Sequence, residues 1–215
     1  MTTLQLHPRT TVRAAGLVDV PAVVRLFAPP PASPRLTVSD PDSPAVDWEQ
    51  AQRAMRLMLA HHALEEGQVW VAERADGALL SAAIWLPPDI GTGSPDPRIS
   101  SLLARELDIS LPERPVLSTA LGAAGPDAPH WTLVTVCAPD DAEACDRTVV
   151  AELLTTGLGA VDGEDATAVA ITLSAHHANQ LRPLGFRGPR EVPLVPGASV
   201  WLTTRHGRSG RADRG

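Results

Sequence analysis

The stretch that decides the fold is "HWTLVTVCAPDDAEACDRTVV", residues 130–150. It begins with a nearly continuous apolar run over 130–138, which predicts a central β-strand buried on both faces. Residues 147–161 then have the pattern of a helix. The turn between them has no glycine and carries four acidic residues, Asp140, Asp141, Glu143 and Asp146. Strand-to-helix turns often bind phosphate through bare backbone N–H groups, so this turn bears on function as well as on fold.

Toward the N-terminus, the pattern predicts a strand, two helices and a hairpin. Residues 11–15 are β-prone, and the apolar residues that follow recur at helical spacing. These residues are Leu17, Val20, Val24 and Phe27. Ser43-Pro44 is typical of a helix cap followed by a first-turn proline, and it precedes a long helical pattern over 45–66. β-rich runs on either side of Asp76-Gly77 predict a hairpin over 69–87.

Toward the C-terminus, strands and helices continue to alternate. We expect a helix over 98–109, a second buried strand over 167–175, a short helix stopped by Gly185 and a closing strand over 197–205. This alternation, with hairpins at the front, predicts an α/β fold with a mixed sheet. Because the chain shows no repeat and no clear linker, residues 1–206 are expected to form a single domain. A disordered tail rich in Arg and Gly is expected over 207–215.

The composition is that of a globular protein, with 44% hydrophobic and 20% charged residues in 215. The formal net charge of −7 argues against nucleic acid as a partner. No apolar run reaches the roughly 18–20 residues that span a bilayer, and the N-terminus lacks a secretory apolar segment, so we expect a cytoplasmic protein without membrane contact. Four arginines near the C-terminus, Arg205, Arg208, Arg211 and Arg214, are expected to lie in a frayed, solvated end.

Taken in order, these pieces resemble the GNAT acyltransferase superfamily, and more narrowly the actinobacterial branch that includes puromycin N-acetyltransferase. The resemblance covers roughly residues 10–206. It is carried by "TVRAAGLVDVPAVVRLFA", "VWVAERADGALLSAAIWLPP", "PHWTLVTVCAPD", "AVAITLSAHHANQLRPLGF" and "VPGASVWLTTR". The "LGF" after a strand and short helix, together with "HW" entering the central strand, is its most specific part.

The resemblance implies a largely antiparallel sheet that splays between its fourth and fifth strands and is flanked by helices. Acetyl-CoA would lie in that wedge, with its pantetheine arm paired to the end of the fourth strand at Val136, Cys137 and Ala138. Its diphosphate would lie on the following turn near Arg147, and Asn179 would belong to the same cofactor site. An amine would then attack the thioester.

Two parts of the family's machinery are missing from this sequence. The diphosphate turn, glycine-rich in the family, maps onto residues 142–147, and no glycine occurs between Pro126 and Thr156. Each acid held near a diphosphate costs on the order of 1 kcal/mol at surface dielectric. The tyrosine that protonates the departing thiolate in many members maps onto Leu181, and the chain contains no tyrosine. Acetyl-CoA is therefore the cofactor that the resemblance implies, with binding expected to be impaired or lost.

The histidines are the remaining candidates for acid–base chemistry. His176 and His177 follow the fifth predicted strand, beside the expected wedge, where they could act as a base or bind an anion. We take these two as the candidate catalytic residues, and the alternative is that they are exposed loop residues. No histidine pair has metal-ligand spacing with an accompanying acid, so no metal site is expected. Cys137 and Ser174 lack an adjacent signature of an activated nucleophile, and their side chains are interpreted as structural.

The candidate substrate site consists of Trp48, His62, Trp85 and His130. The two tryptophans map to the place where the family builds its acceptor pocket, and they could form an apolar floor. The alternatives are that both are core residues, that His62 is a satisfied histidine on the apolar side of the long helix, and that His130 is a structural strand edge.

Three functions fit these observations. The first is a GNAT-fold N-acyltransferase-like protein that acts on a small molecule of the secondary-metabolite or resistance type, with impaired or lost acetyl-CoA binding. The second is a CoA-independent enzyme of different chemistry in a biosynthetic pathway. The third is a non-catalytic small-molecule binder or pseudo-enzyme. In each case we expect a small-molecule ligand and a monomer or homodimer.

Overall fold

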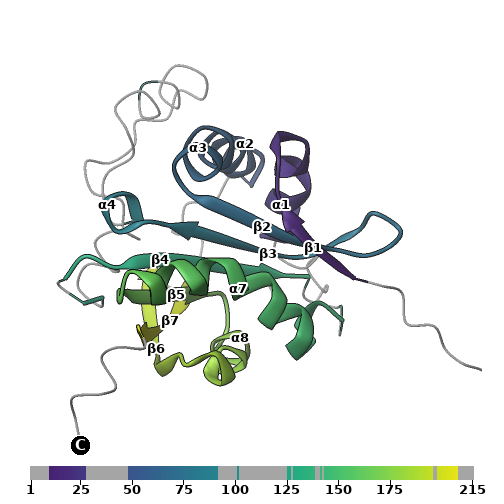
Figure 1. Ribbon diagram of the computed structural model, residues 1–215. Helices are drawn as coiled ribbons and strands as arrows, with labels where there is room; N and C mark the ends of the chain where they lie inside the picture. Colours follow the sequence, from purple (N-terminus) through teal and green to yellow (C-terminus); the bar gives the residue numbers. More distant parts are fainter. Residues whose placement is uncertain are drawn as a thin grey trace, which may run out of the picture.

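The structure, a computed structural model, describes residues 10–27, 48–91, 101, 125–126, 128–138, 141, 143–195 and 198–207. A seven-stranded sheet in the order β1-β2-β3-β4-β5-β7-β6 forms its centre (Figure 1). The first three strands are β1 (Thr11–Ala14), β2 (Gln68–Glu73) and β3 (Leu79–Leu86). The others are β4 (Trp131–Cys137), β5 (Thr167–Thr172), β6 (Arg187–Val195) and β7 (Ala198–His206).

All neighbouring strands are antiparallel except β4 and β5, which run parallel. The prediction of a mixed, largely antiparallel sheet flanked by helices is therefore confirmed. The hairpin of β2 and β3 turns at Gly77, whose φ of 86° lies in the left-handed region that favours glycine. The predicted strand over 130–138 is β4, which lies in the middle of the sheet as its apolar pattern indicates.

Helices cover both faces of this sheet (Figure 1). On one face lie α1 (Val20–Leu26), α2 (Trp48–Met58), a π-helical turn η2 (Leu59–Ala63) and α3 (Leu64–Glu66), and this layer packs against Val71, Ile84 and Val136. On the other face α7 (Arg147–Gly163) packs against Trp85 and Leu133. None of the helices in the described ranges has the length and apolar character needed to cross a lipid bilayer.

Short helical segments complete the described part. They are the 3₁₀ turns η1 (Leu17–Asp19), η3 (Glu143–Cys145) and η4 (Arg182–Leu184) and the helices α4 (Pro88–Gly91) and α8 (Ala175–Gln180). Gly185 ends η4 with a φ of 96°, which confirms the stop predicted from the sequence.

The structure departs from the sequence analysis at three places. The sequence analysis predicted no strand over 187–195, where β6 lies. Its prolines Pro189 and Pro193 cannot donate backbone hydrogen bonds, but β6 is an edge strand, where proline is tolerated. Leu17 lies in η1 and is 68% exposed, so it is not part of the buried face of α1.

The third departure is Arg205, which ends the predicted closing strand but was also expected to be solvated with the arginines of the tail. Its side chain is buried, and Asp162 accepts two hydrogen bonds from its guanidinium at 2.7 and 2.8 Å. Three predictions fall outside the described residues: the cap at Ser43-Pro44, the helix over 98–109 apart from Ser101, and residues 208–215 of the tail.

Candidate active site at the splay of β4 and β5

The site is built where β4 and β5 separate. Their register pairs run from Trp131 opposite Ala168 to Val134 opposite Ile171, while β4 stays paired with β3 as far as Cys137. The last three residues of β4 therefore extend past the β4–β5 ladder. This opening is the splay between the fourth and fifth strands that the resemblance implies.

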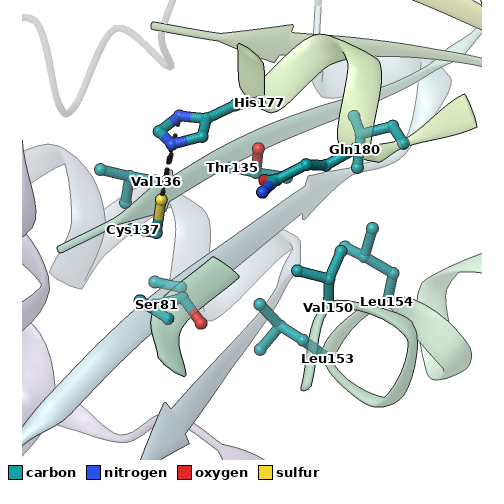
Figure 2. A pocket seen from close by; sticks show the side chains of 12 residues that line it. Ser81, Thr135, Val136, Cys137, Val150, Leu153, Leu154, His177 and Gln180 are labelled. Atoms are coloured by element: carbon teal, nitrogen blue, oxygen red, sulfur yellow. Dashed lines mark hydrogen bonds between the residues drawn. The ribbon is translucent and has the colours of Figure 1, made fainter. Parts of the chain in front are cut away.

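A pocket occupies this splay between β4, α7 and α8 (Figure 2). Its lining includes Ser81 of β3, Thr135 and Cys137 of β4, Leu153 of α7, and His177 and Leu181 on the α8 side. The cavity measures about 30 Å³. Because a buried water needs roughly 10–15 Å³ on this measure, the pocket has room for about two water molecules.

Cys137 and His177 face each other across the splay (Figure 2). The cysteine Sγ lies 2.9 Å from Nε2 of the histidine and 3.8 Å from Nδ1. The contact joins the end of β4 to α8, which are 40 residues apart in the sequence. A thiol within hydrogen-bond reach of an imidazole is the arrangement in which histidine can take the thiol proton.

The position of His177 follows from the local sequence after β5. Ser174 caps α8, because its hydroxyl oxygen accepts a hydrogen bond from the His177 backbone N–H at 3.3 Å. The capped first turn thus places the His177 side chain over Cys137. Burial lowers the pKa of the imidazole from its ordinary value of 6.5, and the neighbouring His176 lowers it further, so the neutral, proton-accepting form is favoured.

The acidic turn after β4 is held by its own side chains. Arg74, at the end of the β2 side of the hairpin, donates hydrogen bonds to Asp141 and to Glu143, and the Thr10 hydroxyl also donates to Glu143. Burial disfavours the charged form of Asp141, but the hydrogen bonds from Arg74 and from backbone N–H groups outweigh this, so the pKa of its carboxyl lies below the ordinary value. We call Arg74, Asp141 and Glu143 the Arg74 clasp.

Several backbone donors of this turn already have acceptors within the chain. The Glu143 N–H donates to the Asp141 carboxylate at 3.0 Å, and the Thr148 N–H donates to the Asp146 carboxylate at 2.8 Å. The N–H groups of Ala144 and Asp146 donate to carbonyl oxygens of the same turn at 3.2 and 3.0 Å. Asp146 is thereby the N-cap of α7, and its carboxylate lies where a helix N-terminus would otherwise receive an anion.

The other predicted catalytic and cofactor residues are distributed unevenly around the pocket. Val136 lines it together with Cys137, whereas Arg147, His176 and Asn179 are exposed and are not among its lining residues. Ala138 follows β4, and its N–H donates to Leu80 O of β3 at 2.8 Å.

The predicted substrate residues do not meet at this pocket. Trp85 is fully buried beneath α7, and His130 is buried at the opposite end of β4, with its Nδ1 2.9 Å from Ala128 O. His62 lies in the π-helical turn on the other face of the sheet, with a buried Nδ1. Trp48 begins α2, but its side chain lies outside the described part. The proposed substrate roles of these four residues therefore stay predictions.

Sequence reasoning assigned Cys137 only a backbone role and took its thiol as structural. It missed the thiol because Cys137 and His177 have no shared motif, and only the β4–β5 splay brings them together. The available signal was their placement: Cys137 ends β4 and His177 comes shortly after β5, and the carboxyl ends of these two adjacent parallel strands lie at the same edge. Among the residues that the structure describes, no three His, Cys, Asp or Glu side chains form a possible metal-binding group.

No protein-family model matches this sequence. No curated protein matches it either. Several solved structures are similar to this chain. A Corynebacterium glutamicum protein described as histone acetyltransferase HPA2 and related acetyltransferase has a TM-score of 0.57 at 19% identity, covering 91% of this chain and 95% of its own.

Two further structures extend this comparison. The C-terminal condensation domain of Ebony, solved in complex with beta-alanyl-dopamine, has a TM-score of 0.56 at 10% identity and covers 93% of this chain and 100% of its own. A GNAT-superfamily phosphinothricin acetyltransferase from Sinorhizobium meliloti, in complex with AcCoA, has a TM-score of 0.46 at 12% identity, with 93% and 91% covered. The chain has the fold of the GNAT N-acetyltransferases.

Proposed function

We propose that the protein is an N-acyltransferase-like enzyme that acts on a small molecule. It takes its acyl group from a thioester donor, and it does not bind this donor through a diphosphate. The proposal combines the GNAT fold with the chemistry of the splay between β4 and β5. It includes the expectation of a single domain over 1–206 that works in the cytoplasm as a monomer or homodimer. A role in secondary metabolism or antibiotic resistance, in the branch near puromycin N-acetyltransferase, belongs to the same proposal.

One observation carries it: the splay is present, while in the following turn the N–H groups of Glu143 and Thr148 bind the chain's own carboxylates. A diphosphate on this turn would have to displace the carboxylates of Asp141 and Asp146 and would then lie beside them. Hydrogen bonds to charged groups contribute about 1.5–3 kcal/mol each, so the loss of several removes most of the affinity that a nucleotide tail supplies. The acyl-bearing arm would still meet the end of β4.

The test compares two donors that share the same thioester arm. Isothermal titration with acetyl-CoA and with S-acetyl-pantetheine, which lacks the nucleotide, measures what the diphosphate contributes. We expect the two dissociation constants to agree within about threefold, which corresponds to less than 1 kcal/mol. An acetyl-CoA affinity about 100-fold or more above that of S-acetyl-pantetheine would overturn the proposal.

A pair of variants checks the cause. Asp146→Asn keeps a good N-cap but removes the charge at the start of α7, and Glu152→Gln removes the same charge from an exposed position further along the helix. Removing one acid near a diphosphate is worth on the order of 1 kcal/mol, so we expect Asp146→Asn to improve acetyl-CoA binding about fivefold. Glu152→Gln should leave it unchanged, and neither should alter S-acetyl-pantetheine binding.

A second candidate is a non-catalytic small-molecule binder. It is favoured by Leu181, which is 2% exposed, lines the pocket and cannot donate a proton where the resemblance places a tyrosine. A CoA-independent enzyme of different chemistry is the remaining alternative. Turnover measured with S-acetyl-pantetheine and a panel of small primary amines separates these: a binder gives saturable binding without amide product.

A further inference from the structure

We propose that Cys137 is a nucleophile that accepts the acyl group covalently, with His177 as its base, so that transfer proceeds through an acyl-cysteine intermediate. This inference rests on the proposed function, because it names the route by which that acyl transfer occurs. The observation behind it is the 2.9 Å contact between Cys137 Sγ and His177 Nε2 at the splay.

The thiol meets the requirements of an accessible nucleophile. Cys137 is partly exposed, is not in a disulfide, and borders the pocket that opens between β4, α7 and α8. A nucleophilic cysteine needs a base within about 2.6–3.2 Å and a place for the reacting carbonyl, and the contact with His177 meets the first need. Burial and the nearby His176 favour neutral His177, which is the form that accepts a proton.

The backbone of β4 supplies a hydrogen-bond donor for the second need. Alternate residues of an antiparallel strand bond to the same neighbour, and the Ala138 N–H donates to Leu80 O of β3. By this alternation the Cys137 N–H points away from β3, on the side of the splay and beyond the last β4–β5 pair at Val134 and Ile171. A carbonyl oxygen held there would have this donor aimed at the charge that develops on it during attack.

The first half-reaction balances as a thiol exchange. The Cys137 Sγ–H proton passes to Nε2 of His177, and the thiolate forms a bond to the carbonyl carbon of the donor thioester. The donor's C–S bond then breaks, and its sulfur leaves with the proton returned by the imidazolium. One thioester is consumed and one is formed, so the step requires no oxidant, reductant or further co-reactant.

The second half-reaction makes the amide. The nitrogen of a small primary amine attacks the carbonyl carbon of acyl-Cys137, and the bond from that carbon to Sγ breaks. One amine proton passes through His177 to the departing sulfur, which regenerates the thiol. His177 thus supplies the proton transfer that Leu181 cannot, and the leaving group of this step is the protein's own thiol.

The experiment is direct acylation of the whole protein. The wild type is incubated with S-acetyl-pantetheine and, separately, with phenyl thioacetate, an activated and smaller thioester, and the site and rate of acetylation are read by mass spectrometry. The sequence contains 18 arginines and no lysine, so no lysine side chain competes for the label. Cys145 is the only other cysteine, which makes Cys145→Ala the matched control for Cys137→Ala.

We expect one acetyl group on Cys137 in the wild type and in Cys145→Ala, and none in Cys137→Ala. His177→Gln should slow acetylation about 100-fold at neutral pH, as expected when a general base is lost. The difference should shrink toward alkaline pH, where a cysteine with an ordinary pKa of about 8.5 ionises without help. A structural role for His177 would not produce this convergence.

Several results would overturn the inference: no label from phenyl thioacetate, label on Cys145 or the N-terminal amine that persists in Cys137→Ala, or an unchanged rate in His177→Gln. Amide formation by the Cys137→Ala variant would also overturn the inference, but it would leave the proposed acyl transfer intact. The opposite outcome is also distinguishable. If Cys137 is labelled but acetyl-CoA binds far more tightly than S-acetyl-pantetheine, the proposed donor preference is wrong and the acyl-cysteine intermediate stands.

Discussion

At the scale of single residues, His177 links the site to solution pH. Its imidazole lies over Cys137 at the start of α8, where burial disfavours the charged form. The pKa in the folded protein is therefore below the ordinary 6.5 that the unfolded chain retains. Between these two values the unfolded state binds more protons than the folded state, so stability rises with pH there.

We therefore predict that the free energy of unfolding falls as the pH is lowered through about 6.5 toward the lower pKa of folded His177. In His177→Gln this part of the pH dependence should be absent, because glutamine does not titrate. Urea denaturation of both proteins between about pH 7.5 and pH 5.5 measures the difference. His176→Gln should keep most of the dependence, since burial is the larger cause; parallel curves for wild type and His177→Gln would contradict the assignment.

At the scale of elements, the approach of α7 to β3 depends on one glycine. A Cβ at Gly157 would lie 2.1 Å from the ring of Trp85, which is fully buried. Helix α7 can therefore approach Trp85 this closely only because residue 157 has no side chain. Gly159, two residues later, has nothing within 4 Å of the same hypothetical atom.

These two glycines give a matched pair of substitutions. We predict that Gly157→Ala lowers the free energy of unfolding by about 1–3 kcal/mol, because overpacking forces Trp85 or α7 to move. Gly159→Ala should raise it by up to about 1 kcal/mol, since alanine is the better helix former and meets no neighbour there. Thermal or urea unfolding of both variants is the measurement, and an equal effect at the two sites would show that Trp85 does not limit the approach.

Also at this scale, local sequence predicted most elements but not the long-range pairs. The hairpin around Gly77 and the stop at Gly185 were predictable because positive φ angles restrict the residue choice locally. Strand β6 was not, because only its edge position makes its prolines acceptable. Arg205 was misassigned because its partner, Asp162, is 43 residues away. The pairing of Cys137 with His177 was missed for the same reason.

At the scale of the whole molecule, stability should vary across the sheet from its centre to its edges. The central strand β4 has neighbours on both sides, whereas β1 and β6 are the two edges. Helices cover both faces near the centre, where β3 and β4 contribute buried residues to more than one cluster. The candidate site lies beside the central strand, at the point where β5 diverges from it.

Native-state amide hydrogen exchange should report this gradient. We predict that amides of β4 that bond to β3 exchange about 100-fold or more slowly than those of β6, because edge strands open locally at lower free energy than the core unfolds. Exchange at Cys137, whose N–H lies past the β4–β5 ladder, should be faster than at Leu133. Uniform protection along β4 would mean that the splay is closed in solution.

The Arg74 clasp has a consequence for engineering. It ties the hairpin to the turn after β4, and the Thr10 hydroxyl, just before β1, also donates a hydrogen bond to the Glu143 carboxylate. Introducing glycine at Ala144 alone would therefore create flexibility without liberating a donor, since Asp141 and Asp146 would still hold theirs. Replacing Asp141 or Glu143 as well would remove a partner of Arg74 and loosen the tie between the hairpin and this turn. Engineering a diphosphate site here therefore competes with the packing of the hairpin, and of these acids only Asp146 can be changed without touching the Arg74 clasp.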